Sequence, residues 1–324
     1  MIGNQTLGLP GSRSRGRLLL CNIGRLGDTI LSNSILDSAF RTYDRVDYLC
    51  GKHNAELVQS DRRMNRVIML RNSIGGFAAV AKAALRRYDG FIGLKDCYSA
   101  TNLILAGLFR SRIKTGWNSD RFRPFDRDVR SISAPDTHKV DMMRRIGELA
   151  GLKPGEYKPS LVLAPDSITW FRRNYAWDKP FIFLNLSATN NSRIWPVEKW
   201  AQYVQGCGLD KNTLLINALT RHAPMAKQLC QMLPGSTVFQ PKRFMDVAAA
   251  LADARLVLTV DTGVVHACSA LNKPIVAFYC AGELRIKYEP LSDRRLLIQA
   301  SPGNRVPDID PQQAIAETLR LPWF

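Results

Sequence analysis

The chain has 324 residues, of which 46% are hydrophobic and 23% charged. It can therefore bury a sizeable core, which excludes a mainly disordered protein, and its length corresponds to two domains at roughly 100–200 residues per domain. With 45 Lys and Arg against 28 Asp and Glu, the formal net charge is +17, which favours an anionic partner: a nucleic acid, a phospholipid surface or a phosphorylated small molecule.

In the first half of the chain, short apolar runs alternate with segments of helical periodicity, which is typical of a parallel sheet covered by helices. Strands are predicted at 17–23, 46–51, 67–70 and 91–95, and helices at about 30–39, 75–87, 98–109 and 137–150. Residues 110–130 are rich in basic residues and contain Gly, Pro and Asn, which predicts a long loop or an irregular hairpin. The Pro and Gly residues of 151–160 predict an interdomain linker.

The same alternation resumes after residue 165. Strands are predicted at 181–188, 213–219, 255–260 and 274–280, and helices near 166–175, 196–207, 223–233, 244–253 and 311–320. A turn followed by a helix is predicted within 261–271. The predicted fold class is α/β, with two Rossmann-like domains whose parallel sheets face a central cleft. The predicted boundaries are a disordered lead over 1–16, an N-terminal domain over 17–160 and a C-terminal domain over 161–324.

The cysteines and the hydropathy pattern indicate a cytosolic protein. The seven cysteines are scattered, form no CxxC pair and mostly lie in apolar runs, which predicts reduced, buried thiols. The polar N-terminus contains no long apolar region, so we expect no secretory signal. No run of ~18 apolar residues is present, so we expect any membrane contact to be peripheral.

The first candidate site follows the first predicted strand, at residues 22–29 (NIGRLGDT). A glycine turn between a strand and a helix lets a ligand approach the backbone, although the spacing matches neither GxGxxG nor a P-loop. Two interpretations remain open. Either Gly27 makes the turn and Asp28 caps the helix, or Asp28 faces the cleft as a general base toward a hydroxyl group.

The second candidate site is residues 260–266 (VDTGVVH), between a predicted strand and a predicted helix. Asp261, Thr262 and Gly263 supply a helix cap and free amide N–H groups, which suit an anion such as a diphosphate. His266 falls one turn into the same helix. The residues are also typical of a capped helix with a satisfied histidine.

The third candidate site is residues 187–196 (SATNNSRIWP), where a strand opens into a loop of small polar residues. Arg193, just ahead of a helix, is well placed for a phosphate. The alternative is a solvated loop in which Trp195 packs on the domain.

Other signals are weaker. The basic segment 110–130 interleaves cations with aromatic residues, as nucleic-acid surfaces can, but no nucleic-acid motif accompanies it. The DxD patterns at 126–128 and 308–310 follow no apolar strand, so we interpret them as loop residues. The four histidines lack metal-ligand spacing, and we expect neither a metal nor a cofactor.

In this order, on two Rossmann-like halves, the three motifs resemble glycosyltransferase family 9, the heptosyltransferase family of lipopolysaccharide core assembly. The resemblance runs from about Arg17 to the terminal helix and rests on NIGRLGDTILSNSIL, SRIWPVEKW, His138 and LTVDTGVVHACSALNKPIVAFY. It implies the GT-B architecture and an inverting, metal-independent transfer. It also implies a nucleotide-diphosphate sugar donor bound by the second domain and an anionic lipid-linked saccharide acceptor bound by the first.

The resemblance also implies roles for individual residues. Asp28 matches the catalytic carboxylate that deprotonates the acceptor hydroxyl. The implied donor-binding residues are Thr189, Arg193, Asp261, Thr262, Gly263 and His266, with Arg193 where the family usually has Lys. We assign Gly27, Arg121 and Arg123 to the acceptor. The basic segment 110–130 and the arginines of 13–17 are assigned to peripheral contact with the cytoplasmic face of the inner membrane, and no nucleic acid is expected.

The chain also departs from the family pattern. After the strand predicted at 213–219, residues 220–224 (TRHAP) stand where the family often has a nucleotide-holding Glu, and 280–282 (CAG) replaces a usual Gly-Pro. These departures bear on donor choice, with a heptose-type sugar as the leading hypothesis. The alternatives are a non-catalytic nucleotide- or nucleic-acid-binding protein on the same scaffold, and a nicotinamide dehydrogenase, for which the glycine motif is incomplete.

Overall fold

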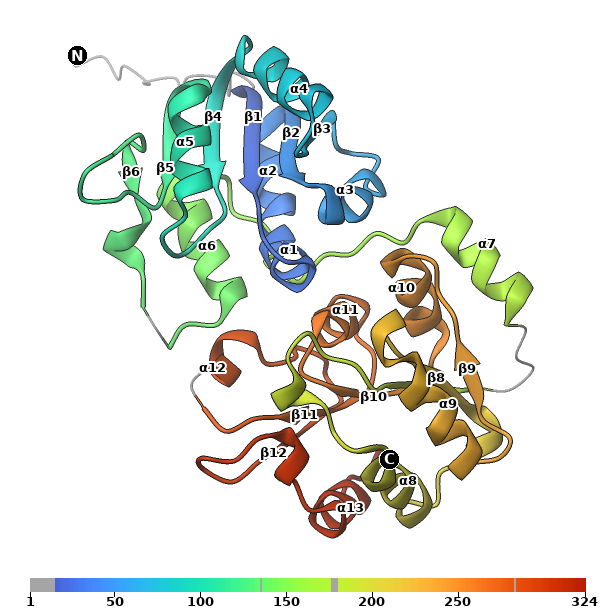
Figure 1. Cartoon of the computed structure of the whole chain (residues 1–324). Coiled ribbons are helices and arrows are strands. Elements are labelled where there is room, and N and C mark those ends of the chain that lie inside the picture. The colour runs from blue at the N-terminus through green and yellow to red at the C-terminus, as the bar shows by residue number, and fades with distance from the viewer. Residues whose placement is uncertain (1–14, 135, 176–179, 283) are drawn as a thin grey trace, which may run out of the picture.

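The computed structural model describes residues 15–134, 136–175, 180–282 and 284–324. Within these residues the strands form two parallel sheets of six, one in each half of the chain (Figure 1). The predicted α/β class with two Rossmann-like halves is therefore confirmed. Strand β1 begins at Arg15, inside the predicted lead over 1–16, and the rest of that lead lies outside the described residues.

The first sheet has the strand order β3-β2-β1-β4-β5-β6. Its strands are β1 (Arg15–Asn22), β2 (Tyr43–Gly51), β3 (Arg66–Leu70), β4 (Arg87–Gly93), β5 (Arg110–Gly116) and β6 (Arg127–Asp128). The helices of this half are α1 (Leu26–Ser32), α2 (Leu36–Thr42), α3 (Lys52–Gln59), α4 (Ile74–Ala84), α5 (Ala100–Leu108) and α6 (Lys139–Ala150). Helices α4 and α5 cover one face of the sheet, since both contribute to one apolar cluster with β1 residues Leu19 and Cys21.

The second sheet has the strand order β12-β11-β10-β7-β8-β9. Its strands are β7 (Ile182–Asn185), β8 (Leu214–Asn217), β9 (Thr237–Phe239), β10 (Leu256–Val260), β11 (Ile275–Tyr279) and β12 (Arg295–Gln299). The helices are α7 (Pro165–Asn174), α8 (Val197–Gly206), α9 (Ala223–Met232), α10 (Phe244–Asp253), α11 (Gly263–Leu271), α12 (Leu284–Tyr288) and α13 (Pro311–Leu319). Read from β9, this order repeats that of the first sheet.

The order places one topological switch point in each sheet. It lies between β1 and β4 in the first sheet and between β7 and β10 in the second, where the connections change direction. Ligands of open α/β sheets bind at the carboxyl ends of the strands at such points. The three candidate motifs follow β1, β7 and β10, so each of them stands at a switch point.

The prediction of a loop or hairpin over 110–130 is wrong for its first third, because residues 110–116 form β5 and pair in parallel with β4. The side chains of β5 are largely polar and only Thr115 and Gly116 are buried. Strands β9 and β12, which lie at the edges of the second sheet, were also not predicted. The strand β9 (TVF) and the apolar run of β12 (LLI) are only three residues long, which is too short to indicate a strand by hydrophobic patterning alone.

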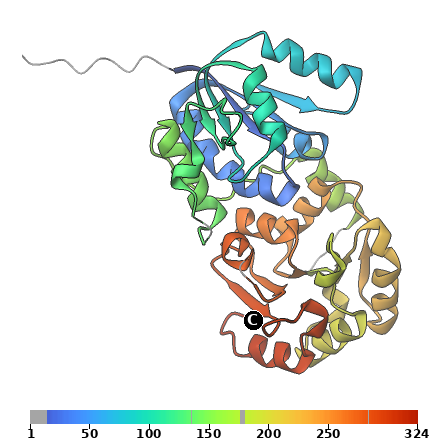
Figure 2. The ribbon, with the colours of Figure 1, turned by 60° about the vertical axis from the view of Figure 1, so that its left-hand side comes forward.

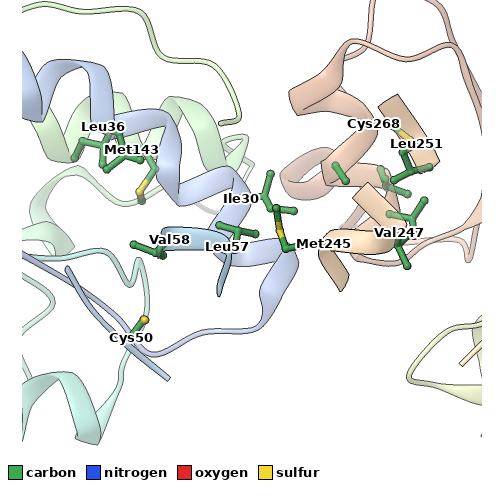
Figure 3. Close-up of a cluster of buried hydrophobic side chains, with 14 of the residues drawn as sticks. Ile30, Leu36, Cys50, Leu57, Val58, Met143, Met245, Val247, Leu251 and Cys268 are labelled. Atoms are coloured by element: carbon green, nitrogen blue, oxygen red, sulfur yellow. The ribbon is translucent and has the colours of Figure 1, made fainter. Parts of the chain in front are cut away.

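An apolar cluster joins the two halves. Ile30 of α1 and Leu57 of α3 point toward Met245 of α10, and all three side chains are buried (Figure 3). The same cluster continues into both sheets. Burial of this surface favours the observed mutual placement of the two halves, with α1 facing α11 (Figure 1).

The packing interpretation of Trp195 can be tested. Its side chain is fully buried, its ring centroid lies 4.5 Å from that of Phe278, and its Nε1 donates a hydrogen bond to the Ile309 carbonyl. We expect Trp195→Ala to lower the free energy of unfolding of this half by about 3–5 kcal/mol. Trp195→Phe should cost clearly less, because it refills part of the space. Urea denaturation followed by circular dichroism measures both. An alanine variant as stable as the wild type would contradict the packing role.

Candidate active site

Asp28 lies in the first turn of α1, just beyond the carboxyl end of β1. The helix begins at Leu26, with Arg25 as an extended N-cap residue that makes no side-chain capping bond. Gly27 therefore lies inside the helix and Asp28 does not cap it, so the capping interpretation of this motif is wrong. The Asp28 carboxylate is left to make contacts outside its own helix.

The Asp28 side chain is 22% exposed and has partners from both halves of the chain. Lys95, which follows β4, places its Nζ 3.6 Å from Asp28 Oδ2. The Tyr288 hydroxyl, at the end of α12 in the second half, donates a hydrogen bond to the same carboxylate. Burial and this carboxylate raise the pKa of Tyr288, so the phenol keeps its proton and remains the donor.

The α1–α11 contact explains why residue 27 is glycine. A Cβ atom at Gly27 would lie 2.5 Å from His266 Cδ2, a distance that real Cβ atoms do not show. A Cβ at Gly263, the first residue of α11, would lie 3.4 Å from Leu26 Cδ2 and 3.7 Å from the Gly27 nitrogen. The first turns of the two helices therefore approach this closely because residue 27 lacks a side chain, whereas a Cβ at Gly263 would make only ordinary van der Waals contacts.

His266 lies one turn into α11, as predicted, and faces this junction. The side chain is buried, and its ring centroid is 6.0 Å from that of Tyr288. Burial lowers the pKa of His266 to about 4, with nearby His138 and Arg193 acting in the same direction and Asp28 opposing them. The imidazole is therefore neutral near pH 7, when it can donate or accept a hydrogen bond but carries no charge.

The start of α11 holds a charged pair. Thr262 is the N-cap residue and accepts a hydrogen bond from the Val264 N–H. The Arg193 guanidinium lies 3.0 Å from the Asp261 carboxylate. Burial raises the pKa of Asp261, and Arg193 opposes that shift. The guanidinium therefore lies beside the residue that precedes the N-cap of α11.

The loop after β7 is braced by the segment that follows β8. Arg221 donates hydrogen bonds from Nη2 to the carbonyls of Ala188 and Thr189, at 2.7 and 2.8 Å. His222 Nδ1 lies 3.2 Å from Ser187 Oγ. The Thr189 side chain is exposed. Residues 220–222, where the family pattern departs, therefore shape the loop that carries Thr189.

A buried ion cluster beside Asp28 was not predicted. Asp96 pairs with Lys139 at 2.9 Å and, across the junction, with Lys287 of α12 at 2.8 Å. Burial alone would raise the pKa of Asp96, but the two lysines outweigh it and hold the pKa at about 2. Asp96 and Lys95 follow β4 at the switch point. The topology rule alone would have identified them as candidates.

The remaining predicted residues lie in different places. His138 caps α6 and its Nε2 lies 3.1 Å from the Glu289 carbonyl of the second half, so it belongs to the junction. Arg121 and Arg123 are exposed between β5 and β6, and Arg123 lies 3.8 Å from Asp128. Strand β4 separates β5 from β1, and no recorded contact of these arginines within the described residues reaches Asp28.

No three His, Cys, Asp or Glu side chains of the described residues lie close enough to hold a metal ion together. No helix in the same residues has the length and apolar character needed to cross a bilayer. The described cysteines are free, and Cys97 is exposed, unlike the buried thiols expected for most of them.

Two Rossmann-like halves of the same strand order, with candidate motifs at both switch points, define the GT-B architecture. Residues 78–315 match the model of glycosyltransferase family 9 (heptosyltransferase). This match covers more than half of the chain, so the protein belongs to glycosyltransferase family 9.

The comparisons with individual proteins agree with this family. A stretch of 102 residues is 32% identical to lipopolysaccharide heptosyltransferase 1 of Salmonella typhimurium, covering 30% of this chain and 31% of that protein. The chain thus spans about a third of the length of the curated relative that it matches.

The family 9 glycosyl transferase of Veillonella parvula has a similar fold, with a TM-score of 0.79 and 16% identity over 95% of this chain and 97% of that chain. The heptosyltransferase WaaC of E. coli with ADP gives a TM-score of 0.74 and 18% identity over 94% and 98%.

The buried neutral His266 predicts a pH dependence of stability. Its pKa is about 4 in the folded chain and about 6.5 in the unfolded chain, so the unfolded chain binds more protons between these values. The contribution of the neutral imidazole to the free energy of unfolding is therefore complete above pH 6.5. It falls by roughly 3 kcal/mol as the pH falls toward 4.

We therefore expect His266→Gln to lose less stability than the wild type between pH 6.5 and 4, measured by urea denaturation at several pH values. His53→Gln is the control, since that histidine is exposed. If the free energy of unfolding changed with pH equally in the wild type and in His266→Gln, His266 would not remain neutral in the folded chain.

Proposed function

We propose that the protein is an inverting, metal-independent glycosyltransferase. It moves a heptose-type sugar from a nucleotide-diphosphate donor to a lipopolysaccharide core acceptor. The observation that supports this proposal is that Asp28 of the first half lies next to the start of α11 in the second half. Family membership supports it, as do the solved structures of WaaC with ADP and with ADP-2-deoxy-2-fluoro heptose.

In the proposed reaction, Asp28 is the general base. Its carboxylate takes the proton from an acceptor hydroxyl while that oxygen attacks the anomeric carbon of the donor. The bond from this carbon to the diphosphate oxygen breaks on the opposite face, so the configuration inverts and the nucleoside diphosphate leaves. For this step the acceptor hydroxyl replaces the Tyr288 hydroxyl as the hydrogen-bond partner of Asp28.

The leaving diphosphate gains negative charge, which the second half of the chain is built to offset. Arg193 supplies a guanidinium, and the start of α11 at Thr262 and Gly263 supplies amide N–H groups and the positive end of the helix dipole. Asp261 pairs with Arg193, so the diphosphate must compete with this carboxylate. Thr189 and the neutral His266 complete the proposed donor site as hydrogen-bonding groups.

On the acceptor side we assign Gly27, Arg121 and Arg123. Gly27 lies in the first turn of α1, directly before Asp28, and the two exposed arginines suit the phosphates of an anionic saccharide. The net charge of +17 supports an acceptor at an anionic lipid surface. The proposed location is therefore the cytoplasm, with peripheral contact at the inner membrane.

Asp28→Asn tests the base. The amide has nearly the same shape but cannot accept the proton, so we expect the turnover number to fall by about 10²–10⁴ with little change in the melting temperature. Transfer is measured with a nucleotide-sugar donor, and donor binding by isothermal titration should persist. The exposed Asp44→Asn is the matched control. Near-normal turnover of Asp28→Asn would refute the base role. Binding without transfer in the wild type would instead support the non-catalytic alternative.

Arg193 tests the donor site. Arg193→Ala removes the cation that faces the diphosphate and leaves Asp261 unpaired, so we expect the KM for the donor to rise and the turnover number to fall, each by about tenfold or more. Arg193→Lys should recover a large part of both, because the ammonium restores the charge without the planar fork. Arg172→Ala, which removes a surface ion pair with Asp253, is the control. Unchanged donor kinetics in Arg193→Ala would remove Arg193 from the site.

A further inference from the structure

Helix α4 carries an apolar stripe on its solvent side in addition to the one that it buries. Val80, Ala83 and Ala84 pack on the sheet. On the opposite side, Ile74 and Leu85 are 90% and 80% exposed, and Phe77 is 58% exposed. Positions 74, 78, 81 and 85 are all exposed and all apolar, and their spacing places them on one face of the helix. A helix that is apolar on all sides is unusual at a protein surface and is typical of burial in a partner or a membrane.

A second helix on the same face of the first sheet has the same property. Ile104 and Leu108 of α5, one turn apart, are 67% and 50% exposed. Phe122, from the segment before β6, lies against α5 at Gly107 and is itself about half exposed. The apolar surface therefore belongs to this side of the first half and not to α4 alone.

Beside α4 the surface is hollowed. A hollow of about 510 Å³ lies between β3 and α4, with an apolar floor that includes Val67, Ile68 and Ala83. Its rim carries four cations: Arg66, Arg71, Lys82 and Arg86. None of the described lining residues is acidic. No recorded ion pair within the described ranges joins any of these cations to a carboxylate. The hollow thus combines uncompensated positive charge with apolar walls.

We propose that this face docks on an anionic phospholipid bilayer. The exposed stripe of α4 enters the boundary between headgroups and acyl chains, and the hollow holds the phosphate of one lipid. This inference rests on the proposed function, which includes a peripheral membrane contact, and it locates that contact at α4. Segment 110–130 contributes to it only through Phe122.

The chemistry of the patch favours a bilayer over other anionic partners. Amphipathic surfaces that bind membranes combine large apolar side chains with flanking Lys and Arg, and both are present here. A single-stranded nucleic acid stacks its bases on aromatic side chains, whereas the two most exposed side chains of this face, Ile74 and Leu85, are aliphatic. The exposed aromatic side chains here are Phe77 and Phe122. Helix α4 also lies at the end of the first half that is distant from the second half in both views (Figures 1 and 2). A flat bilayer can therefore reach it without meeting the second half.

The test is cosedimentation of the full chain with vesicles. We expect binding to phosphatidylcholine vesicles that contain roughly 30% phosphatidylglycerol, weaker binding at high salt, and little binding to pure phosphatidylcholine. Ile74→Ser with Leu85→Ser, and separately Arg71→Gln with Lys82→Gln, should each weaken binding by about tenfold.

Matched controls lie in the second half. Leu319→Ser removes an exposed apolar side chain of α13, and Lys211→Gln with Lys227→Gln removes the same charge as the cationic pair. All controls should bind as the wild type does. No binding by the wild type would overturn the proposal, as would equal loss in the controls. Tighter binding of single-stranded RNA through the same residues would also overturn it, in favour of a nucleic-acid surface.

This experiment uses no sugar donor and is separate from the test of Asp28. Asp28→Asn should bind vesicles normally, whereas the α4 variants should transfer sugar to a delipidated, water-soluble acceptor at the wild-type rate. Failure of vesicle binding together with normal transfer would refute only the docking face. Loss of transfer in Asp28→Asn tests only the base.

Discussion

The close approach of α1 and α11 is the constraint on which the proposed site depends. Gly27 allows the first turns of these helices to meet, because the His266 ring fills the space that a side chain at position 27 would need. This contact places Asp28, from the first switch point, next to a helix start from the second. Neither half contains the site alone, and the interdomain apolar cluster around Ile30 and Met245 favours the same placement.

The charges at the junction are paired in the absence of ligand. Asp28 contacts Lys95 and Tyr288, Arg193 contacts Asp261, and the buried Asp96 is held by lysines from both halves. A buried charge that loses its partner is costly, so the Asp96 cluster opposes separation of the halves around α12. The pairs at Asp28 and Arg193 are less buried, and substrate groups of like chemistry can replace them. The junction therefore combines a permanent ionic contact with two exchangeable ones.

The sequence predicted the buried strands and the motifs that follow them, because both depend on local patterns. A strand covered on both faces is a continuous apolar run, and Asp28, Thr262 and Arg193 follow such runs. Strand β5 was not predicted because its side chains are largely polar, and the edge strand β12 was not predicted because its apolar run is only three residues long. The contacts of Tyr288 and Lys287 were not predicted for another reason, which is that their partners lie more than 190 residues earlier in the chain. Only the relative placement of the two halves brings them to Asp28 and Asp96.

The cations of segment 110–130 and the cations around the α4 hollow differ in what surrounds them on the surface of the first half. Arg123 and Arg130 in the basic segment both pair with the carboxylate of Asp128, so much of the charge of these two arginines is satisfied within the fold. The cations around the α4 hollow have no recorded carboxylate partner within the described residues and lie beside exposed aliphatic side chains. A count of basic residues along the chain favours the segment 110–130 as a membrane contact. Arg110, Arg112 and Arg121 of that segment also have no recorded ion pair within the described residues, so it is the combination of unpaired cations with exposed aliphatic side chains that favours α4. Surface electrostatics follow from what each charge faces, and that depends on the folded arrangement.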